Sequence, residues 1–211
     1  MRIFFAELVG TFAVVVLASG SVVLDSKYSI GLWFVALCPA IAVGSMVYAF
    51  RKISMAHFNP AVTIGFLITK HLPKNRLVLY LLAEVIGAFL GSLFVKHFIG
   101  FQANLGANAP DYSYPIPLIF GIEVLATAFL MGVILIVVHT KGLKGFSGIA
   151  IGGMIGLDIF FLSFISGASM NPIRSLAPAI LSGYLNDLWL YLTATFVGSS
   201  IVALIYRKKF L

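Results

Sequence analysis

Charged residues are scarce in this sequence. Of its 211 residues, only 10% are Asp, Glu, Lys or Arg, while 61% are hydrophobic. Soluble domains have about a quarter of their residues charged, so this composition excludes an ordinary soluble protein. The polar and apolar alternation of a membrane β-barrel is also missing, because residues 14–17 and 133–138 are continuous apolar runs. We therefore expect helices that face lipid.

Cysteine and the usual catalytic patterns are also scarce. Cys38 is the only cysteine, which excludes an internal disulfide and a cysteine metal cluster. Paired carboxylates, metal-ligand spacings, phosphate-binding loops and nucleophile-base arrangements are not found. His71, His97 and His139 lie near the ends of apolar segments without ligand spacing. We expect no enzyme, no metal and no cofactor.

Six apolar segments are long enough to cross a bilayer as helices, at residues 3–24, 31–50, 76–99, 117–139, 147–166 and 187–206. Two shorter apolar segments remain, at residues 59–69 and 172–182, and we interpret them as re-entrant half-helices that do not span. The first segment has an alternative interpretation, since Arg2, an apolar run and the small residues at 18–20 also resemble a secretory signal peptide. Glu7 interrupts the run and argues against it.

The net charge of +7 comes from basic residues at the ends of the apolar segments, with no visible phosphate-binding groove. This distribution argues against a nucleic-acid partner and fits the positive-inside rule, with both termini in the cytoplasm of a multi-pass cell-membrane protein. On the outer side we place only Lys27 and Lys96. The basic residues assigned to the inner side are Arg2, Arg51, Lys52, Lys70, Lys74, Arg76, Lys141, Lys144, Arg207, Lys208 and Lys209.

The chain contains an internal repeat, with halves at about 1–105 and 115–211 of one channel domain. Glu7 and Asn59-Pro60 in the first half match Glu123 and Asn171-Pro172 in the second. With three spans per half, the second copy must enter the membrane from the opposite face, and such inverted repeats place a permeation site between the halves. A carboxylate within a span needs a partner, so we expect Glu7 and Glu123 to accept backbone N–H groups of the two re-entrant loops.

Each half-helix is predicted to begin with Asn-Pro. Proline at the first helical position sacrifices no hydrogen bond, and the preceding asparagine can cap the helix. Two such helices that begin near the bilayer centre would each direct about +0.5 of an elementary charge at one point and repel cations there. The Asn59 and Asn171 amides could donate hydrogen bonds to a passing neutral molecule.

Residues 57–63 and 169–175, HFNPAVT and SMNPIRS, resemble the two signature loops of the aquaporin family, and the resemblance extends over essentially the whole chain. It implies an all-α membrane protein, a right-handed bundle of six transmembrane helices plus two re-entrant half-helices. It also implies one pore per subunit and a homotetramer in the lipid bilayer. The paired motifs are then Asn59-Pro60-Ala61 and Asn171-Pro172-Ile173, the second with Ile in place of the usual Ala.

The resemblance also implies a four-residue selectivity filter of Pro39, Ile159, Ala168 and Arg174. Strict water channels usually have Phe and His at the first two positions, so we expect a less polar filter. Ser175 and Ala179 instead resemble water-selective members, which leaves the solute preference open between water and small neutral solutes such as glycerol, peroxide, ammonia or metalloid hydroxides.

Four further residues are candidates for the pore or its support. Met55 lies where the family usually has Gly, and His57 is a possible inner gate. Asp158 falls within an apolar span and either lines the outer pore or pairs inside the bundle. Glu84 occupies a position that the family often gives to Gln. Cys38 is either a packing residue or a lumen-facing thiol.

A passive channel for water and small uncharged solutes is the function that these patterns favour, and the channel would exclude protons and ions. A secondary transporter or an ion channel is the alternative, since both also use inverted repeats with broken helices. That alternative requires charged or carbonyl ion sites at mid-membrane, where the sequence offers amides and helix N-termini.

Overall fold

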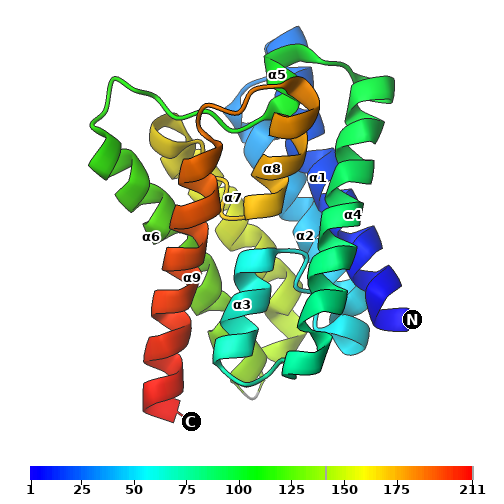
Figure 1. Cartoon of the computed structure of the whole chain (residues 1–211), viewed down its shortest axis with the longest axis vertical. Helices are drawn as coiled ribbons and strands as arrows, with labels where there is room; N and C mark the ends of the chain where they lie inside the picture. Colours follow the sequence, from blue (N-terminus) through cyan, green and yellow to red (C-terminus); the bar gives the residue numbers. More distant parts are fainter. Residues whose placement is uncertain (141, 211) are drawn as a thin grey trace.

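The computed structural model describes residues 1–140 and 142–210, and in these ranges the secondary structure is helical without strands (Figure 1). Lys141, counted above among the inner basic residues, and the last residue, Leu211, lie outside the described residues. Within the described residues, six helices are long and apolar enough to cross a membrane. They are α1 (Arg2–Tyr28), α2 (Leu32–Ser54), α4 (Leu77–Phe94), α6 (Ile116–His139), α7 (Ser147–Ser166) and α9 (Leu188–Phe210). Two of these spans are extended, to Lys74–Ile99 and Lys144–Ser166, by 3-10 helices at Lys74–Arg76 and Lys144–Phe146 and a π-helix at Val95–Ile99. The six predicted spans are confirmed.

Two half-helices complete the bundle, α3 (Pro60–Ile68) and α8 (Pro172–Ser182). With 9 and 11 residues, they are too short to cross a bilayer at about 1.5 Å per residue. In Figure 1 they run from the middle of the molecule toward opposite ends, with their first residues nearest each other. A proline occupies the first turn of each, where its missing N–H removes no helical hydrogen bond.

The helix pairing has the pattern of two equivalent halves. Helix α1 packs on α2 and α4, and correspondingly α6 packs on α7 and α9. The half-helices cross between the halves, because α3 packs on α9 and α8 packs on α4. Contact between α2 and α7 joins the halves again. This arrangement is an inverted repeat, and it makes α1 an integral part of the bundle.

Glycine allows the tightest helix contacts. A Cβ atom added at Gly87 would lie 2.4 Å from the Leu8 carbonyl oxygen, and one added at Gly198 would lie 2.3 Å from the Val124 carbonyl oxygen. Only a residue without a side chain permits this approach, so α1–α4 and α6–α9 meet backbone to backbone.

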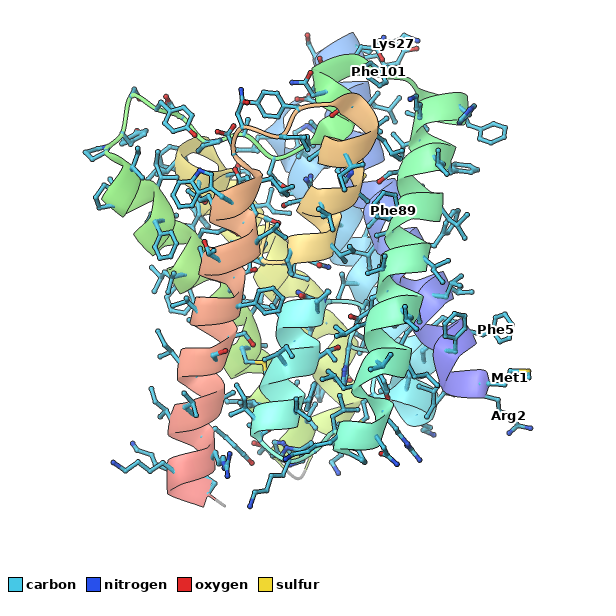
Figure 2. The ribbon with its side chains drawn as sticks, in the orientation of Figure 1. Met1, Arg2, Phe5, Lys27, Phe89 and Phe101 are labelled. Carbon is cyan, nitrogen blue, oxygen red and sulfur yellow. The ribbon has the colours of Figure 1, made fainter. Side chains whose placement is uncertain are left out.

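Large apolar side chains cover much of the outer surface. Phe5 and Phe161 are more than half exposed, as are Val78 and Ile149. In Figure 2, Phe5 points away from the bundle, while Arg2 and Lys27 lie toward opposite ends of it. Such a surface is suited to the hydrocarbon of a bilayer rather than to water.

Candidate functional site

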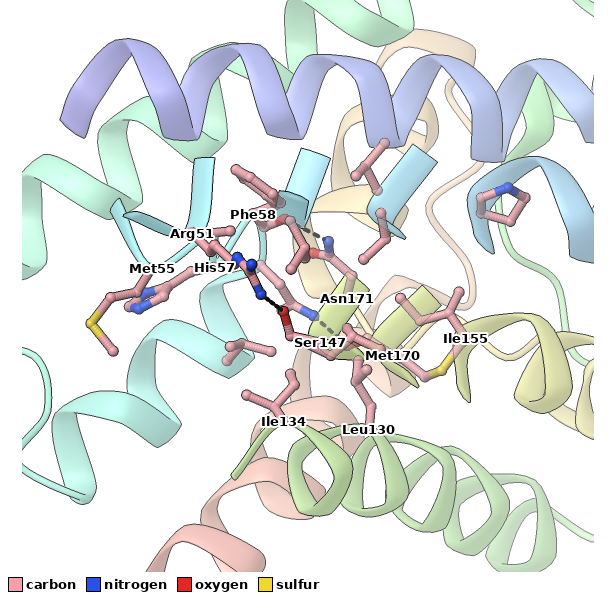
Figure 3. A pocket seen from close by; sticks show the side chains of 18 of the residues that line it. Arg51, Met55, His57, Phe58, Leu130, Ile134, Ser147, Ile155, Met170 and Asn171 are labelled. Atoms are coloured by element: carbon pink, nitrogen blue, oxygen red, sulfur yellow. Dashed lines mark hydrogen bonds between the residues drawn. The ribbon is translucent and has the colours of Figure 1, made fainter. Parts of the chain in front are cut away.

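A cavity of about 340 Å³ lies between the long helices and the loops that precede the half-helices (Figure 3). Most of its lining is aliphatic, including Ile151, Ile155 and Ile159 of α7, which recur every four residues and so share one helix face. Polar groups enter from the two re-entrant loops, including the side chains of Asn59 and Asn171. The cavity therefore combines apolar walls with a short row of amides.

Two buried carboxylates hold the loops in place. Glu7 accepts hydrogen bonds from the backbone N–H groups of His57, at 3.1 Å, and Phe58, at 2.7 Å. The Phe58 backbone has φ 52°, a left-handed conformation that is costly for a residue with a side chain. The carboxylate thus satisfies two N–H groups that no helix can pair and stabilises a strained turn.

Glu123 does the same in the second half. It accepts hydrogen bonds from the N–H groups of Ser169, at 3.2 Å, and Met170, at 2.6 Å, and from the Ser166 hydroxyl at 3.0 Å. Met170 again has a left-handed backbone, with φ 55°. Both glutamates are fully buried, so their oxygens have loop donors in place of water.

The two asparagines cap their half-helices. The Asn59 side-chain oxygen accepts from the Ala61 N–H at 2.9 Å. The Asn171 oxygen accepts from the Ile173 N–H at 3.2 Å and the Arg174 N–H at 3.4 Å. Each cap leaves the NH₂ group of the same amide free to bond elsewhere.

Those NH₂ groups brace the two halves against each other. Asn59 donates to the Met170 carbonyl oxygen at 2.8 Å, and Asn171 donates to the Phe58 carbonyl oxygen at 2.9 Å (Figure 3). An amide NH₂ has two hydrogens, so each asparagine keeps one for the cavity that it lines. The structure thus places two hydrogen-bond donors side by side at the meeting point of the half-helices.

The third residues of the two motifs, Ala61 and Ile173, are not among the residues that line the cavity. The Ala61 carbonyl oxygen accepts a hydrogen bond from Ser199 of α9 at 2.6 Å. Ile173 packs into a buried apolar cluster with Val15, Ala88 and Ala177. The larger side chain at this motif position is therefore accommodated by helix packing.

All four residues predicted for the filter line the cavity: Pro39, Ile159, Ala168 and Arg174. Arg174 is nearly buried, at 8% exposed. Its Nη1 donates to the Gly106 carbonyl oxygen at 3.0 Å and to the side-chain oxygen of Asn108, and its Nη2 lies 3.5 Å from the Ala18 carbonyl oxygen. Of the five N–H groups of a guanidinium, two remain for a solute.

Gly106 and Asn108 were not predicted as site residues from the sequence. Gly106 ends a one-turn segment, α5 (Gln102–Gly106), and Asn108 follows it; within this segment Ala103, Asn104 and Leu105 all have positive φ. Consecutive left-handed residues are uncommon outside glycine, and nothing in the sequence of this loop signals them. The turn directs the chain to the guanidinium of Arg174.

His57 and Met55 lie where the first loop meets the cavity (Figure 3). The His57 ring is stacked on Phe66, with ring centroids 4.5 Å apart, and its Nδ1 lies 2.9 Å from the Thr63 hydroxyl. That hydroxyl donates to Glu84 at 2.6 Å. Packing fixes the imidazole, so it is a wall of the cavity.

Asp158 does not line the cavity, contrary to one of the two interpretations offered above. Its neighbours in sequence and one turn away, Ile159 and Ile155, face the cavity. A helix turns by about 100° per residue, so Asp158 points away from that face. The side chain is buried inside the bundle, and its Oδ2 has no hydrogen-bond partner among the described residues. Cys38 is half-buried and also lies outside the cavity lining.

Three basic residues line the cavity at the end opposite the filter: Arg51, Lys52 and Lys144. Arg51 donates to the Lys144 carbonyl oxygen and to the Ser147 hydroxyl, the latter at 2.7 Å (Figure 3). No acidic side chain is among the described residues that line the cavity. The positive charge at this mouth is therefore not offset by a carboxylate.

The loops that precede α6 and α9 are tied to one another by a carboxylate. Tyr112 and Tyr184 both donate to Asp187, the latter at 2.7 Å. The hydrogen bond to Asp187 raises the pKa of Tyr112 to about 12, because ionising the phenol would remove its proton from the carboxylate. Among residues 1–140 and 142–210, no group of three or more His, Cys, Asp or Glu side chains is placed to hold a metal ion.

Comparison with known proteins gives the family. Residues 1–206 match the family described as Major intrinsic protein. The chain belongs to this family. It is 38% identical over 202 residues to "Aquaporin NIP3-1" of Arabidopsis thaliana, an alignment that covers 92% of this chain and 62% of that protein. This chain therefore spans less than two thirds of the length of that plant relative.

A bacterial relative matches over almost its full length. "Glycerol uptake facilitator protein-like 6" of Lactiplantibacillus plantarum is 34% identical over 215 residues, which cover 98% of this chain and 97% of that protein. The X-ray structure of the aquaglyceroporin from Plasmodium falciparum has a TM-score of 0.84 at 25% identity and matches 99% of this chain and 96% of its own. Together with the cavity, these relatives identify the chain as a passive channel for water or other small solutes.

Proposed function

We propose that this channel conducts water and small uncharged solutes such as glycerol, and that it excludes protons and ions. The observation that supports this most directly is the pair of braced asparagines, Asn59 and Asn171, each with a free N–H beside the cavity. These donors bind a solute oxygen without adding charge, so a neutral molecule replaces its lost water contacts as it passes.

Ion exclusion follows from the charges around the passage. Both half-helices begin at the asparagines, so each contributes about +0.5 of an elementary charge at the same point. Arg174 adds a full positive charge at the filter, where it lines the cavity nearly buried. A cation would meet both without a carboxylate to compensate, whereas a neutral molecule would meet only hydrogen-bond donors.

The filter favours solutes with one polar and one apolar face. Pro39, Ile159 and Ala168 offer carbon surface, and Arg174 offers two free N–H groups. A small polyol matches both the carbon surface and the N–H groups, because its hydroxyls face the guanidinium while its carbon chain lies along the aliphatic wall. The relatives named for glycerol transport support this assignment.

We further propose the assembly and placement that the family resemblance implies. The chain is a single channel domain with halves at about 1–105 and 115–211, it lies in the cell membrane with both termini cytoplasmic, and it assembles as a homotetramer. Its role is transport and not catalysis. Met55 and His57 belong to the inner passage, and Glu7 and Glu123 support the loops.

The test is a flux measurement on purified protein in liposomes, with water and glycerol gradients in parallel for wild type, Ile159→His and Ile149→His. Histidine at the filter should lower glycerol flux at least about fivefold and change water flux less than about twofold, because it narrows an apolar constriction. Ile149 lies on the same helix but is 67% exposed and does not line the cavity, so its variant should conduct like wild type. Absence of water and glycerol flux in wild type would contradict the proposal.

A further inference from the structure

The side chain of Asn108 connects the loop after α5 to α8 and to the loop that precedes α8. Its oxygen accepts hydrogen bonds from Arg174 Nη1 and from the Ser175 hydroxyl, the latter at 2.8 Å. Its Nδ2 donates to the Gly167 carbonyl oxygen at 2.8 Å. Gly167 directly precedes Ala168, so this one amide contacts the loop or half-helix of two of the four filter residues.

The orientation of this amide is fixed by its neighbours. A guanidinium can only donate, and a backbone carbonyl can only accept. Rotating the Asn108 amide by 180° would set its NH₂ against the Arg174 guanidinium and its oxygen against the Gly167 carbonyl. The observed orientation is therefore the one that the surrounding groups can satisfy.

The backbone before Asn108 is held in a conformation that it would not adopt alone. Ala103, Asn104 and Leu105 have φ values of 48°, 51° and 62°. Gly106 follows with φ 68°, and a Cβ atom there would lie 2.5 Å from the Ser19 carbonyl oxygen of α1. Strain of this kind persists only where the surrounding structure determines it, and here it brings the Gly106 carbonyl and the Asn108 amide to one guanidinium.

We propose that Asn108 is the positioning residue of the selectivity filter. It holds the Arg174 guanidinium against the wall and fixes the loop that contains Ala168. Asn108 thereby determines the width of the constriction and which N–H groups of Arg174 remain free for a solute. This inference rests on the proposed channel function. It assigns the solute preference partly to a loop residue that does not itself line the cavity.

Two substitutions of Asn108 separate its effect on the position of the Arg174 side chain from its effect on the charge at the filter. Asn108→Ala removes all three hydrogen bonds, so Arg174 keeps only backbone acceptors and its side chain can turn into the passage. Asn108→Asp keeps an acceptor for Arg174 but places a negative charge beside it, and it loses the donor to Gly167. Asn186, exposed in the loop between α8 and α9, provides matched controls as Asn186→Ala and Asn186→Asp.

The transport test compares the ratio of glycerol to water flux with cation leak in liposomes. Asn108→Ala should change the flux ratio about tenfold, since a lost hydrogen bond to a buried charge shifts a side-chain equilibrium by that order. Asn108→Asp should keep the ratio nearer to wild type and raise the cation leak, because it offsets the charge of Arg174. Both Asn186 variants should match wild type. If wild type conducts and Asn108→Ala leaves the ratio unchanged, the positioning role is wrong while the channel function stands.

A second test does not depend on transport. The protein in detergent is labelled with phenylglyoxal, an arginine reagent, and the modification of Arg174 is followed by mass spectrometry with Arg51 as internal reference. Asn108→Ala should speed modification of Arg174 at least about threefold without changing that of Arg51, since a released guanidinium is more accessible. Equal Arg174 rates in wild type and Asn108→Ala would overturn the inference, even if wild-type flux were also absent.

Discussion

The two re-entrant units, residues 55–69 and 167–183, share their scaffold and differ in their chemistry. Tyr80 donates to the Ser54 carbonyl oxygen at 2.6 Å, and Tyr191 donates to the Ser166 carbonyl oxygen at the same distance. A glutamate of a neighbouring long helix accepts two loop N–H groups from each unit, and an asparagine caps each half-helix. The parts that set the loop geometry are thus present twice.

The difference in charge lies three residues after each asparagine. The first unit has Val62 there, and the second has Arg174. Around Val62 the polar groups bond to one another, as Thr63 does to Glu84. Around Arg174 a separate loop supplies Asn108. One scaffold thus positions both half-helices, while only the second unit adds a buried guanidinium, that of Arg174.

The largest expected effect tests the shared scaffold. Replacing Glu123 with Ala leaves the N–H groups of Ser169 and Met170 buried without an acceptor, at about 1–3 kcal/mol each. Replacing Glu7 with Ala does the same to His57 and Phe58. Both variants should lose several degrees of thermal stability in detergent, followed by fluorescence-detected size exclusion, and both should lose flux. A glutamate whose removal changes neither would show that the units are not equivalent.

The next effect tests the difference between Val62 of the first unit and Arg174 of the second. Arg174→Val gives the second unit the residue of the first and removes the charge from the filter. We expect proton and cation leak to rise about tenfold in liposomes, because the remaining barrier is that of the helix N-termini alone. Water flux should persist. Val62→Ile, a matched apolar change in the first unit, should leave the leak at the wild-type value, and a leak that rose equally in both variants would refute the assignment.

A smaller, symmetrical effect is expected at the glycine contacts. Gly87→Ala and Gly198→Ala each insert a methyl group against a backbone carbonyl and should destabilise the fold by about 1–3 kcal/mol. A Cβ atom at Gly132 of α6 meets nothing within 4 Å, so Gly132→Ala is the control. Thermal unfolding of the three variants measures the loss of stability in each. Unequal losses at Gly87 and Gly198 would break the equivalence of the α1–α4 and α6–α9 contacts.

The smallest effect concerns the loop that follows the first unit. His71 follows α3, and partial burial lowers its pKa below the usual 6.5. Below pH 6.5 the unfolded chain therefore binds a proton that the folded chain resists, so stability should be full above this pH and fall as the solution is acidified. Thermal midpoints at pH 7.5 and 5.5 should differ less in His71→Gln than in wild type. If the thermal midpoint falls equally in wild type and His71→Gln, His71 is not the cause of the pH dependence.

The sequence was sufficient for the scaffold because its signals are local or repeated. Spanning length, short apolar segments and Asn-Pro starts predicted the helices, and the repeat pointed to Glu7 and Glu123. Asn108 could not be found in this way, because its role depends on a left-handed turn imposed by packing against α1. Asp158 was uncertain for a different reason, since one residue of helix phase decides whether a side chain faces the cavity or the bundle.

The most direct test of the account measures water and proton movement together, in liposomes that contain the purified protein and an internal pH dye. Two half-helix N-termini meeting at donor amides predict water flux far above that of empty liposomes, with proton flux unchanged. A proton flux that rises in parallel with water flux, or water flux no greater than in empty liposomes, would contradict it.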